Sequence, residues 1–113
     1  MHELGILYHV AEQVIKVAGE NNVTQVEAIV LQVGKLSAVI PRYLEACYPA
    51  AVDGTMLQNT RLEIETMPAN GRCNSCTKVY DVVDFKQVCP HCGASDYELL
   101  CGKEFFIKEI RAC

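Results

Sequence analysis

Two short stretches, Cys73-Asn-Ser-Cys76 and Cys89-Pro-His-Cys92, decide how the C-terminal half of this chain folds. They are two CxxC pairs separated by twelve residues. A CxxC turn lets two thiolates converge on one ion, and two such turns facing each other complete the tetrahedral four-sulfur cage that Zn²⁺ prefers. The sequence therefore predicts a zinc ribbon, with these four cysteines as ligands and residues 79–83 as a hairpin arm between the two turns.

The four-sulfur cage is expected to be structural. Four thiolates leave no open position for a substrate water, so catalytic zinc is excluded. A thioredoxin-like redox pair would need a CxxC motif that opens a helix after a strand, which this segment lacks, and iron–sulfur clusters usually have a different cysteine spacing. His91 lies inside the second motif. It is interpreted as a solvated side chain that could bind zinc only if a cysteine left the ion.

Three of the seven cysteines lie outside the motifs. None of them has a partner at ligand spacing. We expect Cys47 and Cys101 to be small buried thiols and Cys113 to be a frayed terminal one.

The residues before the ribbon alternate between helical and extended patterns. Apolar residues recur at helical spacing over residues 4–18, which predicts an amphipathic helix after a leader of residues 1–3. Residues 23–33 are rich in β-branched side chains and apolar on both faces, as in a covered strand. A second helix is predicted from Pro41 to about Asp53, and Pro49 should kink or split it. Residues 61–67 alternate like a half-exposed strand.

Strand, helix and strand in this order predict a parallel pair with a right-handed crossover. After the ribbon, residues 97–101 and 104–111 are interpreted as two strands joined by a turn, the second of which rejoins the first sheet. We therefore predict an α+β fold with two helices on a small mixed three-stranded sheet. Residues 1–66, completed by the C-terminal strand 97–113, form an α/β domain, and a zinc-ribbon domain of residues 67–96 is inserted in it.

Composition excludes several functional classes. The 113-residue chain has a net charge of −4, and basic and acidic residues balance within the ribbon. Neither the whole chain nor the ribbon therefore has the excess of positive charge that attracts nucleic acid. No apolar run approaches the roughly 18 residues that a membrane span needs, and the first residues lack the features of an export signal. We expect a cytoplasmic protein that binds neither membrane nor nucleic acid. No nucleophile elbow, phosphate loop or HExxH motif indicates an enzyme.

The chain opens with Met1-His2-Glu3, which offers a second metal site. The α-amine of Met1, the amide nitrogen of His2 and the His2 imidazole can close adjoining chelate rings around one ion in a plane. Ni²⁺ accepts a square-planar nitrogen set, whereas Zn²⁺ favours a tetrahedron. The Glu3 amide, another histidine or a receiving partner could supply the fourth ligand. The alternative roles are a disordered His2 and a Glu3 carboxylate that only stabilises a helix start. His9, on the polar helix face, is a weaker candidate ligand.

Four segments together resemble the HypA/HybF family of nickel metallochaperones, which serve the maturation of nickel–iron hydrogenases. They are residues 1–4, the Val33-Gly-Lys-Leu-Ser37 segment, residues 54–64 with Gly54-Thr55 and Leu62-Glu-Ile64, and the two CxxC motifs. The resemblance spans the whole chain. Histidines that flank the motifs in some members are absent here, because Thr-Lys-Val-Tyr follows Cys76.

This resemblance implies a protein without enzymatic activity that carries Ni(II) at its N-terminal domain. His2 would be the nickel ligand, with the backbone of Met1 and Glu3, and the four motif cysteines would hold structural zinc. The implied partners are a HypB-type GTPase and the hydrogenase large-subunit precursor, with urease as a further client in some bacteria. We expect a monomer or weak homodimer. The competing hypothesis is a zinc-ribbon adaptor for protein or nucleic acid, without a nickel function.

Overall fold

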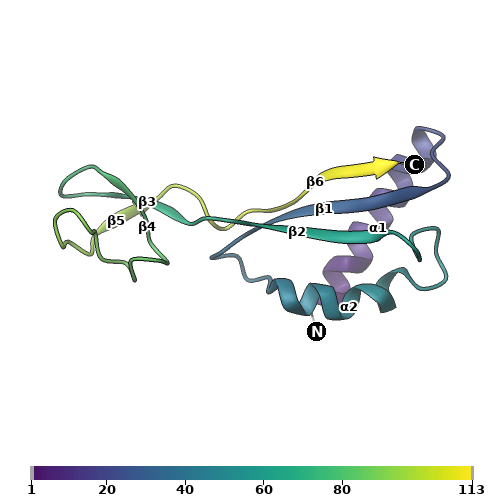
Figure 1. Ribbon diagram of the computed structural model, residues 1–113, viewed down its shortest axis with the longest axis horizontal. Helices are drawn as coiled ribbons and strands as arrows, with labels where there is room; N and C mark the ends of the chain where they lie inside the picture. The colour runs from purple at the N-terminus through teal and green to yellow at the C-terminus, as the bar shows by residue number, and fades with distance from the viewer. Residues whose placement is uncertain (1, 113) are drawn as a thin grey trace. The chain divides into compact units, whose positions relative to one another are not determined.

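The computed structural model describes residues 2–112. Figure 1 shows the order of its elements: α1 (His2–Glu20), β1 (Val26–Gly34), α2 (Pro41–Val52), β2 (Arg61–Met67), β3 (Asn70–Cys73), β4 (Val79–Asp81), β5 (Tyr97–Leu99) and β6 (Phe105–Ala112). They form two compact units. Unit 1 contains residues up to 32, residues 39–65 and residues from 106; unit 2 contains residues 33–38 and 66–105. No helix within residues 2–112 is long and apolar enough to cross a membrane.

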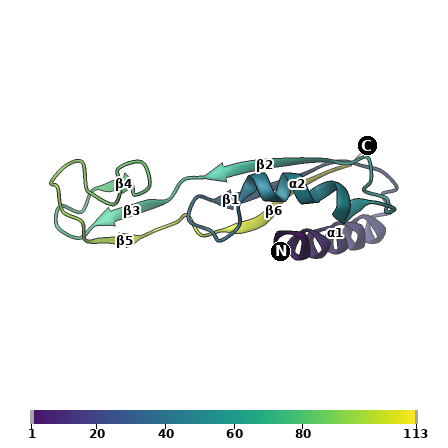
Figure 2. The same cartoon turned by 90° about the horizontal axis from the view of Figure 1, so that it is seen from below.

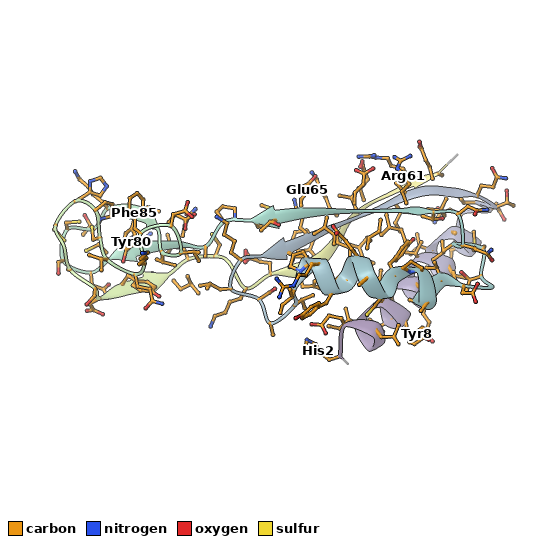
Figure 3. The ribbon with its side chains drawn as sticks, turned by 60° about the horizontal axis from the view of Figure 1, so that its bottom comes forward. His2, Tyr8, Arg61, Glu65, Tyr80 and Phe85 are labelled. Carbon is orange, nitrogen blue, oxygen red and sulfur yellow. The ribbon has the colours of Figure 1, made fainter. Side chains whose placement is uncertain are left out.

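Unit 1 is built on a three-stranded sheet with the order β2-β1-β6. The arrows of β1 and β2 point the same way and that of β6 points the opposite way, so the sheet is mixed (Figures 1 and 3). Both helices lie on the same face of this sheet (Figures 1 and 2). These features confirm the predicted α+β fold class of two helices on a small mixed sheet.

The core of unit 1 lies between this sheet and the helices. In the central strand β1, residues 28–31 are fully buried, which explains why that stretch is apolar on both faces. Helix α1 buries a stripe that includes Leu7, Val14 and Ala18, and it packs against α2, in which Leu44 is fully buried. The helix α1 ends where Asn22 adopts a left-handed φ of 57°.

The other face of the sheet carries charged side chains in ion pairs. Glu65 accepts hydrogen bonds from Lys108 on β6 and from Gln32 on β1, and Glu63 accepts them from Arg61 and Arg111. Figure 3 shows Glu65 and Arg61 on the side away from the helices. The hydrogen bond from Arg61 is the main cause that lowers the pKa of Glu63. The hydrogen bond from Gln32 is the main cause that lowers the pKa of Glu65. The charged side chains on this face are thus paired between strands, which stabilises a sheet face that is not covered by the helices.

The structure differs from the predicted secondary structure in three details. Helix α1 already includes His2 and Glu3, so these two residues do not form a separate leader. Of the two effects predicted for Pro49, the split of α2 does not occur, because the helix is continuous from Pro41 to Val52; the adjacent Tyr48 hydroxyl donates to the Thr60 carbonyl at 3.0 Å. Tyr97–Leu99 does not belong with the C-terminal strand, because β5 pairs with β3 in unit 2.

Unit 2 contains a second sheet with the order β4-β3-β5, and both pairs are antiparallel. Gly71 in β3 lies opposite Tyr80 on β4 and Leu99 on β5. The rings of Tyr80 and Tyr97 meet edge to face with centroids 6.1 Å apart. The buried core is small: Ala69, Cys73, Tyr80, Val82 and Cys89. Two of its five members are cysteines of the CxxC motifs, so the core depends on what those cysteines bind.

The segment of residues 33–38 joins unit 2 through its backbone. Gly34 donates to the Glu104 carbonyl at 2.8 Å, and Leu36 donates to the Gly102 carbonyl at 2.8 Å. The Lys35 ammonium lies 3.4 Å from Asp84 and 3.7 Å from Asp81, the two carboxylates of the β4 turn. The backbone N–H of Asp84, followed by that of Val83 and by the Lys35 charge, lowers the pKa of Asp81. Lys35 thus ties this segment to the ribbon.

We expect Gly34→Ala to destabilise unit 2. Gly34 is buried, and a Cβ added there would overlap the backbone carbonyl of Gly102. Because the overlapping atoms belong to the backbone, no side-chain rotation can remove the clash. Overpacking of this kind costs about 1–3 kcal/mol. Urea titration monitored by tyrosine fluorescence should show the loss.

The control for this prediction is Gly5→Ala. A Cβ at Gly5 meets nothing within 4 Å, and the residue lies inside α1, so alanine should stabilise the helix by up to about 1 kcal/mol. Equal unfolding midpoints for the two variants would contradict the close backbone approach at Gly34.

Candidate metal centres

The two CxxC motifs form two turns with the same backbone pattern. In the first, Cys73 N donates to the Lys78 carbonyl at 2.9 Å and Thr77 N donates to the Cys73 carbonyl at 2.9 Å. In the second, Cys89 N donates to the Ala94 carbonyl at 2.8 Å and Gly93 N donates to the Cys89 carbonyl at 2.9 Å. The residue that follows each motif has a left-handed φ: 66° at Thr77 and 79° at Gly93. Each turn therefore closes tightly behind its cysteines.

The four thiols converge on one point. The sulfurs of Cys73, Cys76, Cys89 and Cys92 all lie within 4.8 Å of one another. The Cys73–Cys92 pair is 3.5 Å apart and the Cys76–Cys89 pair is 3.6 Å apart. A tetrahedral zinc with Zn–S bonds of about 2.3 Å separates its sulfurs by about 3.8 Å. The four sulfurs thus fit a Zn²⁺ ion, which would hold the two turns together.

Backbone N–H groups and neighbouring thiols set the acidity of this cluster. The N–H of Cys76, 3.5 Å from the sulfur of Cys73, is the main cause that lowers the pKa of Cys73 to about 6. The Ala94 N–H lowers the pKa of Cys92, but the neighbouring Cys73 thiol and burial outweigh it and raise the pKa to about 12. Four thiolates so close together need a cation to ionise fully, and a coordinating metal supplies that charge.

The remaining sulfur and imidazole groups lie outside this cage. The His91 side chain is exposed, and the residue supports the second turn through its backbone N–H, 3.4 Å from the sulfur of Cys89. Cys47 is buried, as predicted. Cys101 is only half-buried, with its thiol 3.7 Å from the Pro68 carbonyl, so the prediction that it is buried is wrong. Cys113 lies outside the described residues.

The predicted nickel ligand His2 occupies the first turn of α1. Its side chain is 60% exposed, and Figure 3 shows it at the start of the helix, on the side away from the sheet. The backbone N–H groups of a first helical turn have no partner within the helix, so the amides of His2 and Glu3 are free of helical hydrogen bonds. The Met1 backbone, which is also predicted to contribute, lies outside the described residues. His9 is exposed further along the same helix.

Sequence reasoning missed the burial of Glu3. Its side chain is only 5% exposed, and one carboxylate oxygen, Oε2, lies 3.2 Å from the Nε2 atom of His2. An acidic residue in the first turn of a helix predicts a favourable interaction with the helix dipole. An exposed carboxylate makes this interaction as well as a buried one does, so it says nothing about burial. No sequence pattern distinguishes the two cases, because tertiary contacts decide the burial.

The chain matches a known protein family over almost its whole length. A family profile described as "Hydrogenase/urease nickel incorporation, metallochaperone, hypA" matches residues 1–112. The chain belongs to this HypA family. It is 38% identical over 110 residues to "Hydrogenase maturation factor HypA" of Geobacter metallireducens, an alignment that covers 97% of each chain. It is 35% identical to the protein of the same description from Streptomyces avermitilis, over 97% of this chain and 86% of that one.

Solved structures of HypA proteins share the fold. The solution structure of the nickel metallochaperone HypA from Helicobacter pylori superposes with a TM-score of 0.66 and 17% identity, over 97% of this chain and 96% of that one. A second structure, described as the solution structure of HypA protein, gives a TM-score of 0.71 and 18% identity over 100% and 97% of the two chains. By the descriptions of the family and of these relatives, HypA proteins are nickel metallochaperones of hydrogenase maturation rather than catalysts.

Proposed function

We propose that this chain binds Ni(II) at its N-terminus and delivers it to the large-subunit precursor of a nickel–iron hydrogenase, and to urease where the cell has one. The observation that carries this proposal is the exposed His2 in the first turn of α1, in a chain that matches the HypA family from residue 1. Delivery takes place in the cytoplasm, with a HypB-type GTPase as partner. The protein acts as a monomer or weak homodimer.

The proposed nickel ligands are nitrogens of the first three residues. The His2 imidazole and the amide nitrogen of His2 bind together with the α-amine of Met1, and the Glu3 amide is available as the fourth donor. A nitrogen set of this kind suits Ni²⁺ in a square plane. The amides lie in the first helical turn, so their deprotonation breaks no hydrogen bond of α1.

The proposed role of the four-cysteine cluster is to hold a structural zinc ion. Cys73, Cys76, Cys89 and Cys92 would fill all four positions of a tetrahedral ion, so the ion has no free position for catalysis. Bound zinc would neutralise the thiolates and connect the two halves of the small core of unit 2. Nickel transfer is then assigned to the N-terminal site alone.

Calorimetric titration with nickel tests the proposed site. Wild type should bind one nickel per chain, and His2→Ala should weaken binding by at least about 100-fold, because loss of a ligand exceeds the usual effect of losing a supporting group. The matched control is His9→Ala, an exposed histidine on the same helix, which should bind like wild type. Absence of nickel binding by wild type would favour the adaptor hypothesis instead, and binding that is unchanged in His2→Ala would contradict the N-terminal site.

A transfer experiment tests the delivery step. Nickel-loaded protein is mixed with the metal-free hydrogenase large-subunit precursor, and the nickel content of the precursor is measured after separation. We expect transfer from wild type and none from His2→Ala supplied with the same total nickel. Equal nickel uptake by the precursor from both proteins and from free nickel salt would contradict a delivery role.

A further inference from the structure

The Glu3 carboxylate is an unusual feature of unit 1 that the proposed ligand set does not use. Glu3 is one of only two buried polar or charged residues among those described, and the other, Thr60, donates its hydroxyl to the Val26 carbonyl at 2.7 Å. The Oε2 atom of Glu3 is itself buried and has no hydrogen-bond partner within residues 2–112. Burying a carboxylate is costly unless a partner compensates its charge. The Nε2 atom of His2 lies 3.2 Å from this oxygen.

The chelate proposed above requires a particular face of the His2 imidazole. When an amide nitrogen and the imidazole of the same residue bind one ion, only Nδ1 closes a six-membered ring. Nε2 then points away from the metal and carries the proton. The structure places this outward nitrogen beside the buried Glu3 oxygen. A carboxylate that accepts the remaining N–H of a metal-bound histidine fixes its tautomer and its ring orientation.

We infer that Glu3 is a positioning residue for nickel: its carboxylate accepts the Nε2–H of His2 and presents Nδ1 to the metal. The 3.2 Å separation is short enough for this bond, and a rotation of the exposed imidazole aligns it. The buried Glu3 is fixed by its surroundings while the His2 side chain is 60% exposed, so the carboxylate determines where the imidazole points. This inference rests on the proposed function of the N-terminus.

Two substitutions of Glu3 separate its charge from its hydrogen bond. Glu3→Ala removes both, and we expect it to weaken nickel binding by about 10–100-fold, the usual effect of losing such a partner. Glu3→Gln keeps an acceptor oxygen in a side chain of the same shape, so it should weaken nickel binding less than Glu3→Ala does. The matched control is Glu12→Gln, an exposed glutamate on α1, which should bind nickel like wild type. Nickel affinity is measured by calorimetric titration.

The tautomer of His2 provides a readout that a merely structural role of Glu3 would not change. Long-range ¹H–¹⁵N spectra of the imidazoles are recorded without nickel at pH of about 8, where an ordinary imidazole is neutral. His2 should carry its proton almost entirely on Nε2 in wild type, and in Glu3→Ala it should shift to the ordinary mixture of Nε2–H and Nδ1–H tautomers that a solvated histidine shows. His9 and His91 are internal references that should not change, and melting curves and zinc content should match wild type.

The outcomes distinguish this inference from the proposed function. If wild type binds no nickel, or binds it equally well with His2→Ala, both are overturned. If wild type binds nickel through His2 but Glu3→Ala has the same affinity and the same His2 tautomer, only the inference is overturned. A Glu3→Ala protein with weaker nickel binding, a lower melting temperature and an unchanged tautomer would also overturn it, because Glu3 would then only stabilise α1.

Discussion

Replacing Cys73 by serine is expected to release the zinc and to unfold unit 2, while α1 and α2 remain helical. Cys73 is fully buried, supplies a proposed ligand, and is one of five residues in the small core. Domains below about 70 residues rarely bury enough apolar surface to be stable without disulfides, a metal or another cross-link, and a structural zinc ion contributes folding free energy. Hydrogen exchange should show loss of amide protection across β3, β4 and β5, with protection in α1 unchanged.

A second cysteine provides the control for this prediction. Cys101 lies in the same unit but outside the cluster, so Cys101→Ser should keep its zinc and its amide protection. A strong chelator should reproduce the effect of Cys73→Ser on wild type. Absence of zinc from the purified protein, or a ribbon that keeps its amide protection after chelation, would contradict the assignment.

The four-cysteine cluster could be predicted because ligand spacing is a local property. Two CxxC motifs constrain their own turns, and both turns formed with the same hydrogen bonds, as at Cys73 and Cys89. The strand of residues 61–67 could be predicted for a similar reason, since its alternation of apolar and charged residues reflects the two faces of an edge strand. Local patterns succeed where one short segment contains all the information.

The errors concern places where distant contacts decide the structure. Residues 97–99 carry an alternating pattern that suits either sheet, and only pairing with β3, opposite Cys73 and Gly71, places them in unit 2. Pro49 weakens an isolated helix, but the buried Ala51 and Val52 beyond it keep the last turn of α2 packed. The contacts of Lys35 with two aspartates almost fifty residues away likewise have no local signal.

Adding two residues before Met1 is expected to abolish nickel binding as completely as His2→Ala does. The proposed site uses the α-amine of Met1, which an extension converts into an amide and moves away from His2. Acetylation of the same amine removes its charge and its lone pair, and it should have the same effect. Calorimetric titration with nickel measures the loss. Zinc content should not change, because the four sulfurs belong to unit 2.

The control for this prediction carries the same two residues after Cys113, and it should bind nickel like wild type. A cleavable extension provides a further test, because its removal regenerates the α-amine and should restore binding without refolding. The alternative is a site built from His2 with side chains only, such as the carboxylate of Glu3, and this site does not need the amine. The extended protein would then bind nickel undiminished while His2→Ala did not, and the amine chelate would be wrong even though His2 is required.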